Sequence, residues 1–212
     1  MKTTIKFLVV TFLLIATTLA NGFNVNRSGS QTFSFKDKMG SNQATFYSSA
    51  PLEDITGMST DVRGKVSFDV DDITNTLKGE LKISTASLKS GIDLRDEHIR
   101  SENWLNAEKY PEITFNINDV KNVKEIDGNK IKAIVTGEFT VHGVTKNVTS
   151  EVELTYLEES EFTKIRLPGD LLGVKAKFNI KLSEFGVLNM ALGKRVADDI
   201  EIKVNIVGSN KI

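Results

Sequence analysis

Two histidines are the side chains of this chain best suited to proton transfer or metal binding, and cysteine is absent. The first, His98, lies in an acidic neighbourhood between Asp96 and Glu102. If this stretch is helical, His98 and Glu102 share one face at a spacing of four residues, which could supply half of a metal site. A structural zinc ion needs four ligands, and the sequence has no second cluster of His or Cys. We therefore interpret His98 as a solvated histidine on a helix surface.

The remaining polar residues do not form a recognisable catalytic motif. The sequence has no thiol and no Gly-x-Ser-x-Gly motif, so it contains no recognisable nucleophile for acyl transfer. His142 falls in an expected turn. The acidic pairs Asp71-Asp72, Glu158-Glu159 and Asp198-Asp199 lack the spacing of a calcium loop and are interpreted as solvated turn charges. The sequence therefore predicts a protein that is not an enzyme and requires no cofactor or metal.

Most of the chain is expected to form β-strands. In residues 77–83 apolar or small side chains alternate with charged ones, so one face of the strand meets a core and the other meets water. Connections such as Asp127-Gly128 and His142-Gly143 favour tight antiparallel turns, because Gly accepts a positive φ. The expected strands are Phe33–Phe35, Ala44–Ser49, Val62–Val70, Leu77–Ser84, Ile113–Val120, Ile131–Val141, Val144–Tyr156, Val174–Leu182 and Ile200–Val207. These nine candidates are close in number to the strands of an eight-stranded barrel, so we predict an all-β fold, an antiparallel eight-stranded barrel.

One stretch, residues 93–115, interrupts this alternation. Asp93 is suited to be an N-cap, Glu97 and Glu102 are good helix formers, and Pro111 would end the run. We expect one short helical insertion that covers an end of the barrel.

Trp104 and Leu105 form the bulky apolar part of this insertion. They could close the mouth of the barrel over a lipid tail or present an entry site at a membrane surface. Alternatively, they cap the barrel core like any packed helix. Both interpretations place the insertion on the barrel end.

The expected inward positions combine large and very small side chains. The large ones include Phe68, Leu81, Phe115, Phe139 and Phe178, and the small ones include Gly64, Gly79, Ala133, Gly137 and Ala176. Small residues would leave space for an elongated apolar ligand. Glycines also mark the bulges and bends that barrel closure requires, in which case the interior is filled. The pattern leaves both interpretations open.

The first 20 residues have the features of a secretory signal. Lys2 and Lys6 precede an apolar run, Phe7–Leu19, and small residues precede an expected cleavage after Ala20. The run is shorter than the roughly 20 residues that span a bilayer. We predict an exported protein, periplasmic or secreted, with residues 21–212 as a single domain. Since the whole chain carries a net charge of −1 and the signal removes two lysines, the mature chain is mildly acidic and nucleic acid is not an expected partner.

Three blocks carry a resemblance to a known family. Residues 96–115 (DEHIRSENWLNAEKYPEITF), Gly137–Val148 (GEFTVHGVTKNV) and Phe178–Gly186 (FNIKLSEFG) resemble the YceI family of polyisoprenoid-binding, lipocalin-like proteins and occur in that family's order. The resemblance covers about residues 62–207. It implies a lipocalin-like barrel that binds, stores or transports an amphiphilic isoprenoid lipid, either a polyisoprenoid or an isoprenoid quinone.

With this implied ligand, the residues expected to contact the lipid are inward apolar positions and the mouth. They are Val66, Phe68, Leu81, Ile83, Trp104, Leu105, Phe115, Ile117, Val135, Phe139, Phe178 and Ile180. Transient contact with a membrane surface and a homodimer are further expectations. Two alternatives stay open: a packed barrel that serves as an envelope stress or interaction module without ligand, and a lipid-acting enzyme that uses His98 with a neighbouring acid.

Overall fold

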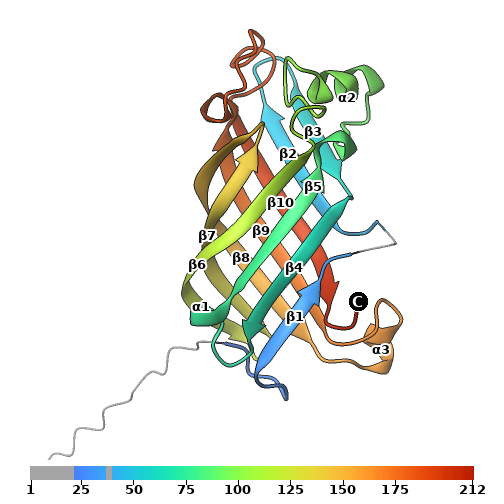
Figure 1. Ribbon diagram of the computed structural model, residues 1–212, viewed down its shortest axis with the longest axis vertical. Coiled ribbons are helices and arrows are strands. Elements are labelled where there is room, and N and C mark those ends of the chain that lie inside the picture. Colours follow the sequence, from blue (N-terminus) through green and yellow to red (C-terminus); the bar gives the residue numbers. More distant parts are fainter. Residues whose placement is uncertain (1–21, 37–39) are drawn as a thin grey trace, which may run out of the picture.

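The computed structural model describes residues 22–36 and 40–212, which form a closed antiparallel β-barrel (Figure 1). Eight strands follow one another around it in the order β1-β4-β5-β6-β7-β8-β9-β10, and pairing of Ser34 with Ser209 joins β1 to β10. The strands are β1 (Ser30–Ser34), β2 (Gln43–Ser49), β3 (Asp54–Ser59), β4 (Val62–Asp69), β5 (Lys78–Ser84), β6 (Glu112–Asp127), β7 (Lys130–Val141), β8 (Val144–Leu157), β9 (Leu171–Lys181) and β10 (Asp199–Ser209). The predicted all-β, eight-stranded antiparallel barrel is confirmed.

The remaining two strands, β2 and β3, form a hairpin that extends one end of the wall. β2 pairs with residues 200–205 of β10, whereas β1 meets β10 only at Ser209. The two strands therefore share one edge of β10 at different heights. β3 was not predicted, because its inward positions Ile55, Gly57 and Ser59 include only one large apolar side chain. Gly57 is required there, since a Cβ would lie 2.2 Å from the ring of Phe46.

Strand β6 is also longer than predicted. It continues from Val120 to Asp127 and remains paired with β7 through several register shifts, up to the pair Asp127–Lys130. Such bulges interrupt the simple alternation on which the prediction rested while they preserve pairing. The tight turn at His142-Gly143 is as expected, with φ values of 52° and 75°.

The helices are short and lie at the ends of the barrel. α1 (Ile73–Thr76) and α3 (Glu161–Lys164) lie toward one end, and α2 (Asp93–Arg100) covers the other (Figure 1). Two 3-10 turns occupy Thr85–Ser87 and Leu182–Phe185. None of the helices in the described ranges is long and apolar enough to cross a bilayer.

The predicted helical insertion is present, but it is shorter than expected. α2 ends at Arg100, and the chain then turns back so that the backbone N–H groups of Trp104 and Asn106 both donate to the carbonyl of Ser101. Asn106 has a φ of 47°, which is incompatible with a continuing right-handed helix. Trp104 and Leu105 therefore lie in turns after α2, and the expectation that they lie on a helix is wrong. Asp93 is the first helical residue rather than the N-cap, which is Ile92.

Aromatic rings fill the barrel end opposite α2. The ring of Phe33 stacks on Phe68 with centroids 5.6 Å apart, and it meets Tyr156 edge-on at 5.6 Å. Phe23 packs against both Phe68 and Tyr156. This end is closed by side chains, as the filled-interior interpretation proposed. A second group of buried residues, which includes Phe139, Phe178 and Phe185, lies along the other part of the barrel. The expected signal, residues 1–20, lies outside the described residues.

Candidate functional site

A cavity of about 660 Å³ occupies the barrel interior and extends to the residues of α2. Pockets that bind small molecules measure about 300–1,000 Å³ and are mostly apolar, so this volume suits a ligand. Every strand from β2 to β10 contributes residues to the walls. Most of these are every second residue of a strand, since successive side chains point to opposite faces. The open-cavity interpretation therefore holds for this part of the barrel, between α2 and the aromatic cluster.

Eleven of the twelve residues proposed from the sequence line this cavity. They are Val66, Leu81, Ile83, Trp104, Leu105, Phe115, Ile117, Val135, Phe139, Phe178 and Ile180. Phe68 does not line it. Phe68 lies two residues beyond Val66 on the same face of β4, and its ring, only 1% exposed, is stacked on Phe33 in the closed end. Its inward orientation was predicted, whereas the depth at which the interior becomes filled was not.

Aromatic rings form part of the cavity wall. Phe139 lies edge-on to Phe178 with centroids 5.3 Å apart, and Phe115 lies 6.1 Å from Phe178. Gly137 gives room to one of these rings, since a Cβ there would lie 2.6 Å from Cζ of Phe115. The small side chain of Ala176, in contrast, lines the cavity directly. The small residues thus have two roles, close packing and open space, which the sequence pattern did not distinguish.

Several lining residues were missed by sequence reasoning because they lie outside the strands first recognised. They come from the β2–β3 hairpin, from the residues around α2 and from the connection between β9 and β10. Examples are Ile55, Leu88, Ile92, Ile99 and Ala191. Ala44 and Phe46 also line the cavity, on a strand that was expected but whose residues were not among the predicted lipid contacts. The alternation of Ile55, Gly57 and Ser59 was the available signal for the hairpin. The other segments are irregular, and no periodicity identifies their inward residues.

Three of the four Asp, Glu, Lys or Arg residues that line the cavity lie on segments that border its mouth, and the fourth, Lys82, lies on β5 and is paired with Glu80 at 3.0 Å. Glu53, next to the β2–β3 turn, accepts a hydrogen bond from Nη2 of Arg95 on α2 at 2.8 Å. Arg195, from the β9–β10 connection, lines the same opening. The amide nitrogen of Asn189 in that connection donates to the carbonyl oxygen of Asn103 at 3.1 Å. Polar contacts therefore join the three segments that border the mouth, while the deeper wall is mostly apolar, with Ser150 of β8 among its residues.

The two histidines have different environments. His98 lines the mouth and is exposed, but α2 ends before Glu102, so the predicted helical spacing of these two residues is not realised. His142 lies in the β7–β8 turn, where Nδ1 is 3.1 Å from the carbonyl oxygen of Phe185 and the ring packs edge-on against Tyr110. Within residues 22–36 and 40–212, no group of three or more His, Cys, Asp or Glu is arranged to hold a metal ion.

The acidic pairs contribute hydrogen bonds to loops. Asp72 caps α1 by accepting from the backbone N–H of Asn75. Asp198 accepts from the backbone N–H and hydroxyl of Ser183. Burial raises the pKa of Asp198, but these two hydrogen bonds outweigh burial and lower the pKa overall. Glu159 accepts from Lys211 at 2.9 Å. These acids have structural partners within the protein.

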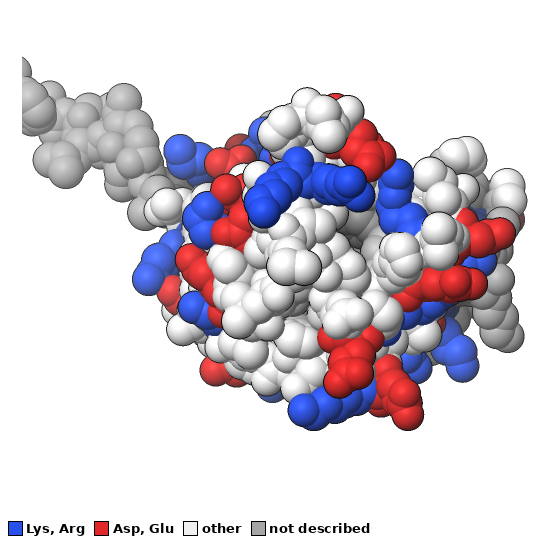
Figure 2. All heavy atoms as spheres, turned by 90° about the horizontal axis from the view of Figure 1, so that it is seen from above, with Lys and Arg blue, Asp and Glu red and all other residues white. Residues whose placement is uncertain are grey.

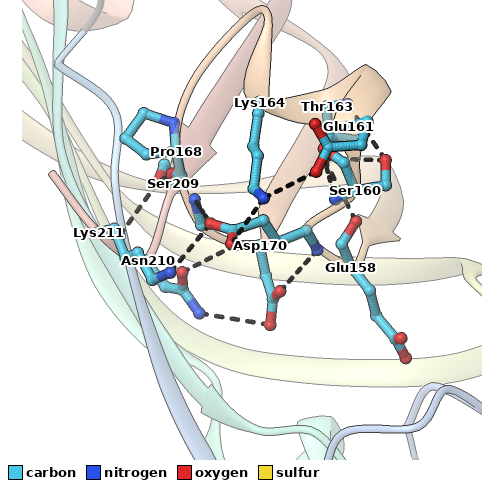
Figure 3. A network of polar contacts seen from close by, with 12 residues as sticks. Glu158, Ser160, Glu161, Thr163, Lys164, Pro168, Asp170, Ser209, Asn210 and Lys211 are labelled. Atoms are coloured by element: carbon cyan, nitrogen blue, oxygen red, sulfur yellow. Dashed lines mark hydrogen bonds and ion pairs between the residues drawn. The ribbon is translucent and has the colours of Figure 1, made fainter.

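A buried carboxylate, Asp170, organises the closed end. It accepts from Oη of Tyr156 at 2.7 Å, from Nε of Arg27 at 2.9 Å and from the backbone N–H of Glu159 at 2.8 Å. Figure 3 shows part of this network, with the Asp170 carboxylate beside the Asn210 amide. Burial raises the pKa of Asp170, yet the three donors favour the ionised form and lower the pKa overall. Burial and the Asp170 carboxylate raise the pKa of Tyr156. The network lies opposite α2 and does not line the cavity.

Comparison with known proteins connects this barrel to a family. A family model described as a YceI-like domain matches residues 24–208. A UPF0312 protein of Vibrio parahaemolyticus is 32% identical over 149 residues, which cover 70% of this chain and 73% of that protein.

Two solved structures have the same fold. BcnA of Burkholderia cenocepacia superposes with a TM-score of 0.60 at 21% identity, over 81% of this chain and 99% of that one. A polyisoprenoid binding domain from Saccharophagus degradans gives a TM-score of 0.58 at 13% identity, over 87% of this chain and 99% of that domain. The family match spans nearly all of the barrel described above, and the chain therefore belongs to the YceI-like family.

Proposed function

We propose that this protein binds an amphiphilic isoprenoid lipid, a polyisoprenoid or an isoprenoid quinone, inside the barrel and stores or transports it. The observation that carries this proposal is the largely apolar cavity of about 660 Å³, with Glu53, Arg95 and Arg195 on the segments that border its mouth. A hydrocarbon chain would lie against apolar side chains, and a polar head would remain beside Arg95, His98 and Arg195.

The affinity would come from burial of the chain. Removing hydrocarbon from water is worth about 0.8 kcal/mol per CH₂ group, so several isoprene units give a large favourable term without any specific polar contact. Binding by burial requires no catalytic group. This agrees with the exposed position of His98 and the structural contacts of His142. We therefore propose a binding protein that needs no cofactor.

The isoprenoid character of the ligand is supported by the family and by the solved domain from Saccharophagus degradans that is called polyisoprenoid binding. That likeness is one of fold, since the two chains are 13% identical. We further propose that the chain is exported, because residues 1–20 have the composition of a signal peptide.

Trp104 provides a direct test, because it is the single tryptophan of the chain and lines the cavity. Lipid-free protein would be titrated with an isoprenoid quinone, which quenches indole fluorescence on contact. We expect saturable quenching at one quinone per chain, and competition by a polyprenol that does not itself quench. Quenching that rises linearly with quinone and is unaffected by the polyprenol would contradict binding in the cavity.

A further inference from the structure

Five large apolar side chains are exposed on the segments that border the cavity mouth. They are Leu52 at 83%, Ile92 at 50%, Leu94 at 62%, Leu188 at 84% and Met190 at 90% exposure. We call these five residues the apolar rim. Single exposed apolar residues are normal, but several together around one opening mark a surface that contacts something apolar.

The apolar rim is continuous with the cavity. Ile92 and Leu94 are exposed and also line the cavity. In the β9–β10 connection, Asn189 and Ala191 line the cavity, whereas Leu188 and Met190 do not and are almost fully exposed. This connection therefore has one side toward the cavity and one toward solvent. An apolar chain that leaves the cavity meets the apolar rim.

Charge on the same connection favours a particular partner. Lys194 and Arg195 are both exposed, and neither side chain forms an ion pair within the described part of the chain. The two acids of this connection already have partners: Asp198 accepts hydrogen bonds from Ser183, and Glu184 is 3.6 Å from the ammonium of Lys146. Figure 2 shows this end of the molecule, where a broad uncharged area is bordered by both cationic and acidic side chains.

The acids on the neighbouring segments are partly neutralised. Glu53 is paired with Arg95, and Asp96 is 5% exposed and accepts hydrogen bonds from Ser90. Asp93 and Glu97 remain exposed on α2. The basic, apolar side of the mouth is therefore the β9–β10 connection, and α2 forms its more acidic side.

We propose that this end of the barrel docks on a bilayer that carries anionic headgroups, with Leu188 and Met190 inserted among the lipids and Lys194 and Arg195 at the phosphate level. Exposed apolar side chains next to cations are the combination that binds such an interface. The docked barrel would let an isoprenoid chain pass between bilayer and cavity without crossing water. This passage rests on the function proposed above, whereas docking itself can be measured separately.

The opposite end of the barrel supplies a matched control. Phe162 and Ile165, at α3, are 82% and 83% exposed, which is close to the exposure of Leu188 and Met190. Neither of them lines the cavity. If exposed apolar groups adsorb on lipid in general, both Leu188/Met190 and Phe162/Ile165 should contribute to binding. If the barrel docks through its cavity mouth, Leu188/Met190 should contribute and Phe162/Ile165 should not.

The experiment measures co-sedimentation with vesicles of phosphatidylglycerol and phosphatidylcholine, and with vesicles of phosphatidylcholine alone. The full chain would be expressed in a bacterial host, and the intact mass would record the same N terminus for every variant. We expect Leu188→Ser/Met190→Ser to weaken partition onto the mixed vesicles by about tenfold or more, and Phe162→Ser/Ile165→Ser to leave it unchanged. Lys194→Gln should weaken it about fivefold on mixed vesicles and not on neutral ones.

Equal partition of the two double variants and the parent protein would overturn the proposal, as would a parent protein that does not sediment with either kind of vesicle. Dimerisation that is lost in Leu188→Ser/Met190→Ser, without vesicle binding, would instead identify the apolar rim as a contact between two copies and would also overturn it. Quinone quenching of Trp104, measured without vesicles, reports cavity binding independently. Docking without quenching would contradict the lipid-binding function alone.

Discussion

The ring of Phe139 on β7 lies edge-on to the ring of Phe178 on β9, with their centroids 5.3 Å apart and an angle of 72° between the ring planes. Both rings line the cavity, and β8 separates their strands in the sheet. Edge-to-face contacts of this kind add about 0.5–1.5 kcal/mol beyond the burial of the rings. The pair therefore stiffens the wall against which the lipid chain is proposed to lie.

Replacement of Phe139 with Asp tests this wall. A carboxylate at this 6% exposed position would face an apolar chain, so we expect Phe139→Asp to abolish co-purification of lipid. The adjacent variant Glu138→Lys places its change on the outer face and should retain lipid. Lipid would be quantified by mass spectrometry in protein whose β-structure is verified by circular dichroism. Equal lipid content in the two variants would contradict the assignment of the site.

A larger side chain inside the cavity tests whether the ligand occupies this space, without introducing a charge. Ala176 lines the cavity, and Ala176→Phe would place a ring in the space proposed for the lipid chain. We expect the quinone to bind about tenfold more weakly or worse, since the loss of even two buried CH₂ contacts is worth about 1.6 kcal/mol. The control is Lys175→Phe, on the outer face of the same strand, where the side chain of Lys175 is 68% exposed. Unchanged affinity in Ala176→Phe would place the ligand elsewhere.

The closed end predicts a pH dependence of stability. Asp170→Asn removes a carboxylate that is 2% exposed and accepts from Tyr156 and Arg27, so we expect a loss of about 1–3 kcal/mol in the free energy of unfolding at pH 7. The pKa of Asp170 is lowered by folding, so its stabilisation is present above the unfolded pKa of about 3.9 and is lost as the pH falls through the folded pKa.

Urea unfolding at pH 7 and at pH 3 checks this expectation. The difference in unfolding free energy between the parent protein and Asp170→Asn should shrink at the lower pH. Asp71→Asn, at an exposed position, should have little effect on stability at pH 7. A difference that is the same at both pH values would mean that the ionised form of Asp170 does not carry the stabilisation.

The β7–β8 turn predicts a steric effect that can be separated from backbone strain. Gly143 has a φ of 75°, and a Cβ there would lie 2.3 Å from the ring of Tyr110. Gly29 has a φ of 73° with no atom within 4 Å of the corresponding Cβ. Both alanine variants incur the cost of a positive φ, about 1 kcal/mol. Gly143→Ala should therefore lower the melting temperature clearly more than Gly29→Ala, and equal shifts would exclude the contact with Tyr110.

The extent to which the sequence predicted this structure depends on the regularity of each segment. The long strands were predicted because their inward faces alternate, as in Leu77, Leu81 and Ile83, all of which line the cavity. β3 was missed because Gly57 and Ser59 replace bulky residues on its inward face. The end of α2 at Arg100 was missed because the left-handed backbone of Asn106 and the hydrogen bonds to Ser101 O are not encoded in a helical pattern.

The sequence predicted which side chains point into the barrel, but not how far the open cavity extends along the barrel. Alternation identified the side chains that point inward, yet it could not show where the aromatic cluster of Phe33, Phe68 and Tyr156 ends and open space begins. That boundary depends on contacts between residues distant in the sequence. The mouth was only partly predicted, because Ile92 and Ala191 lie in irregular segments.

The central claim is that the cavity holds an isoprenoid lipid, and native mass spectrometry of the purified protein tests it most directly. The protein would be purified without detergent, and the bound molecule would be released, extracted with organic solvent and identified. We predict one polyisoprenoid or isoprenoid quinone per chain, absent from Phe139→Asp. Protein that carries no lipid, and that takes up none after incubation with polyprenols and quinones, would contradict the claim.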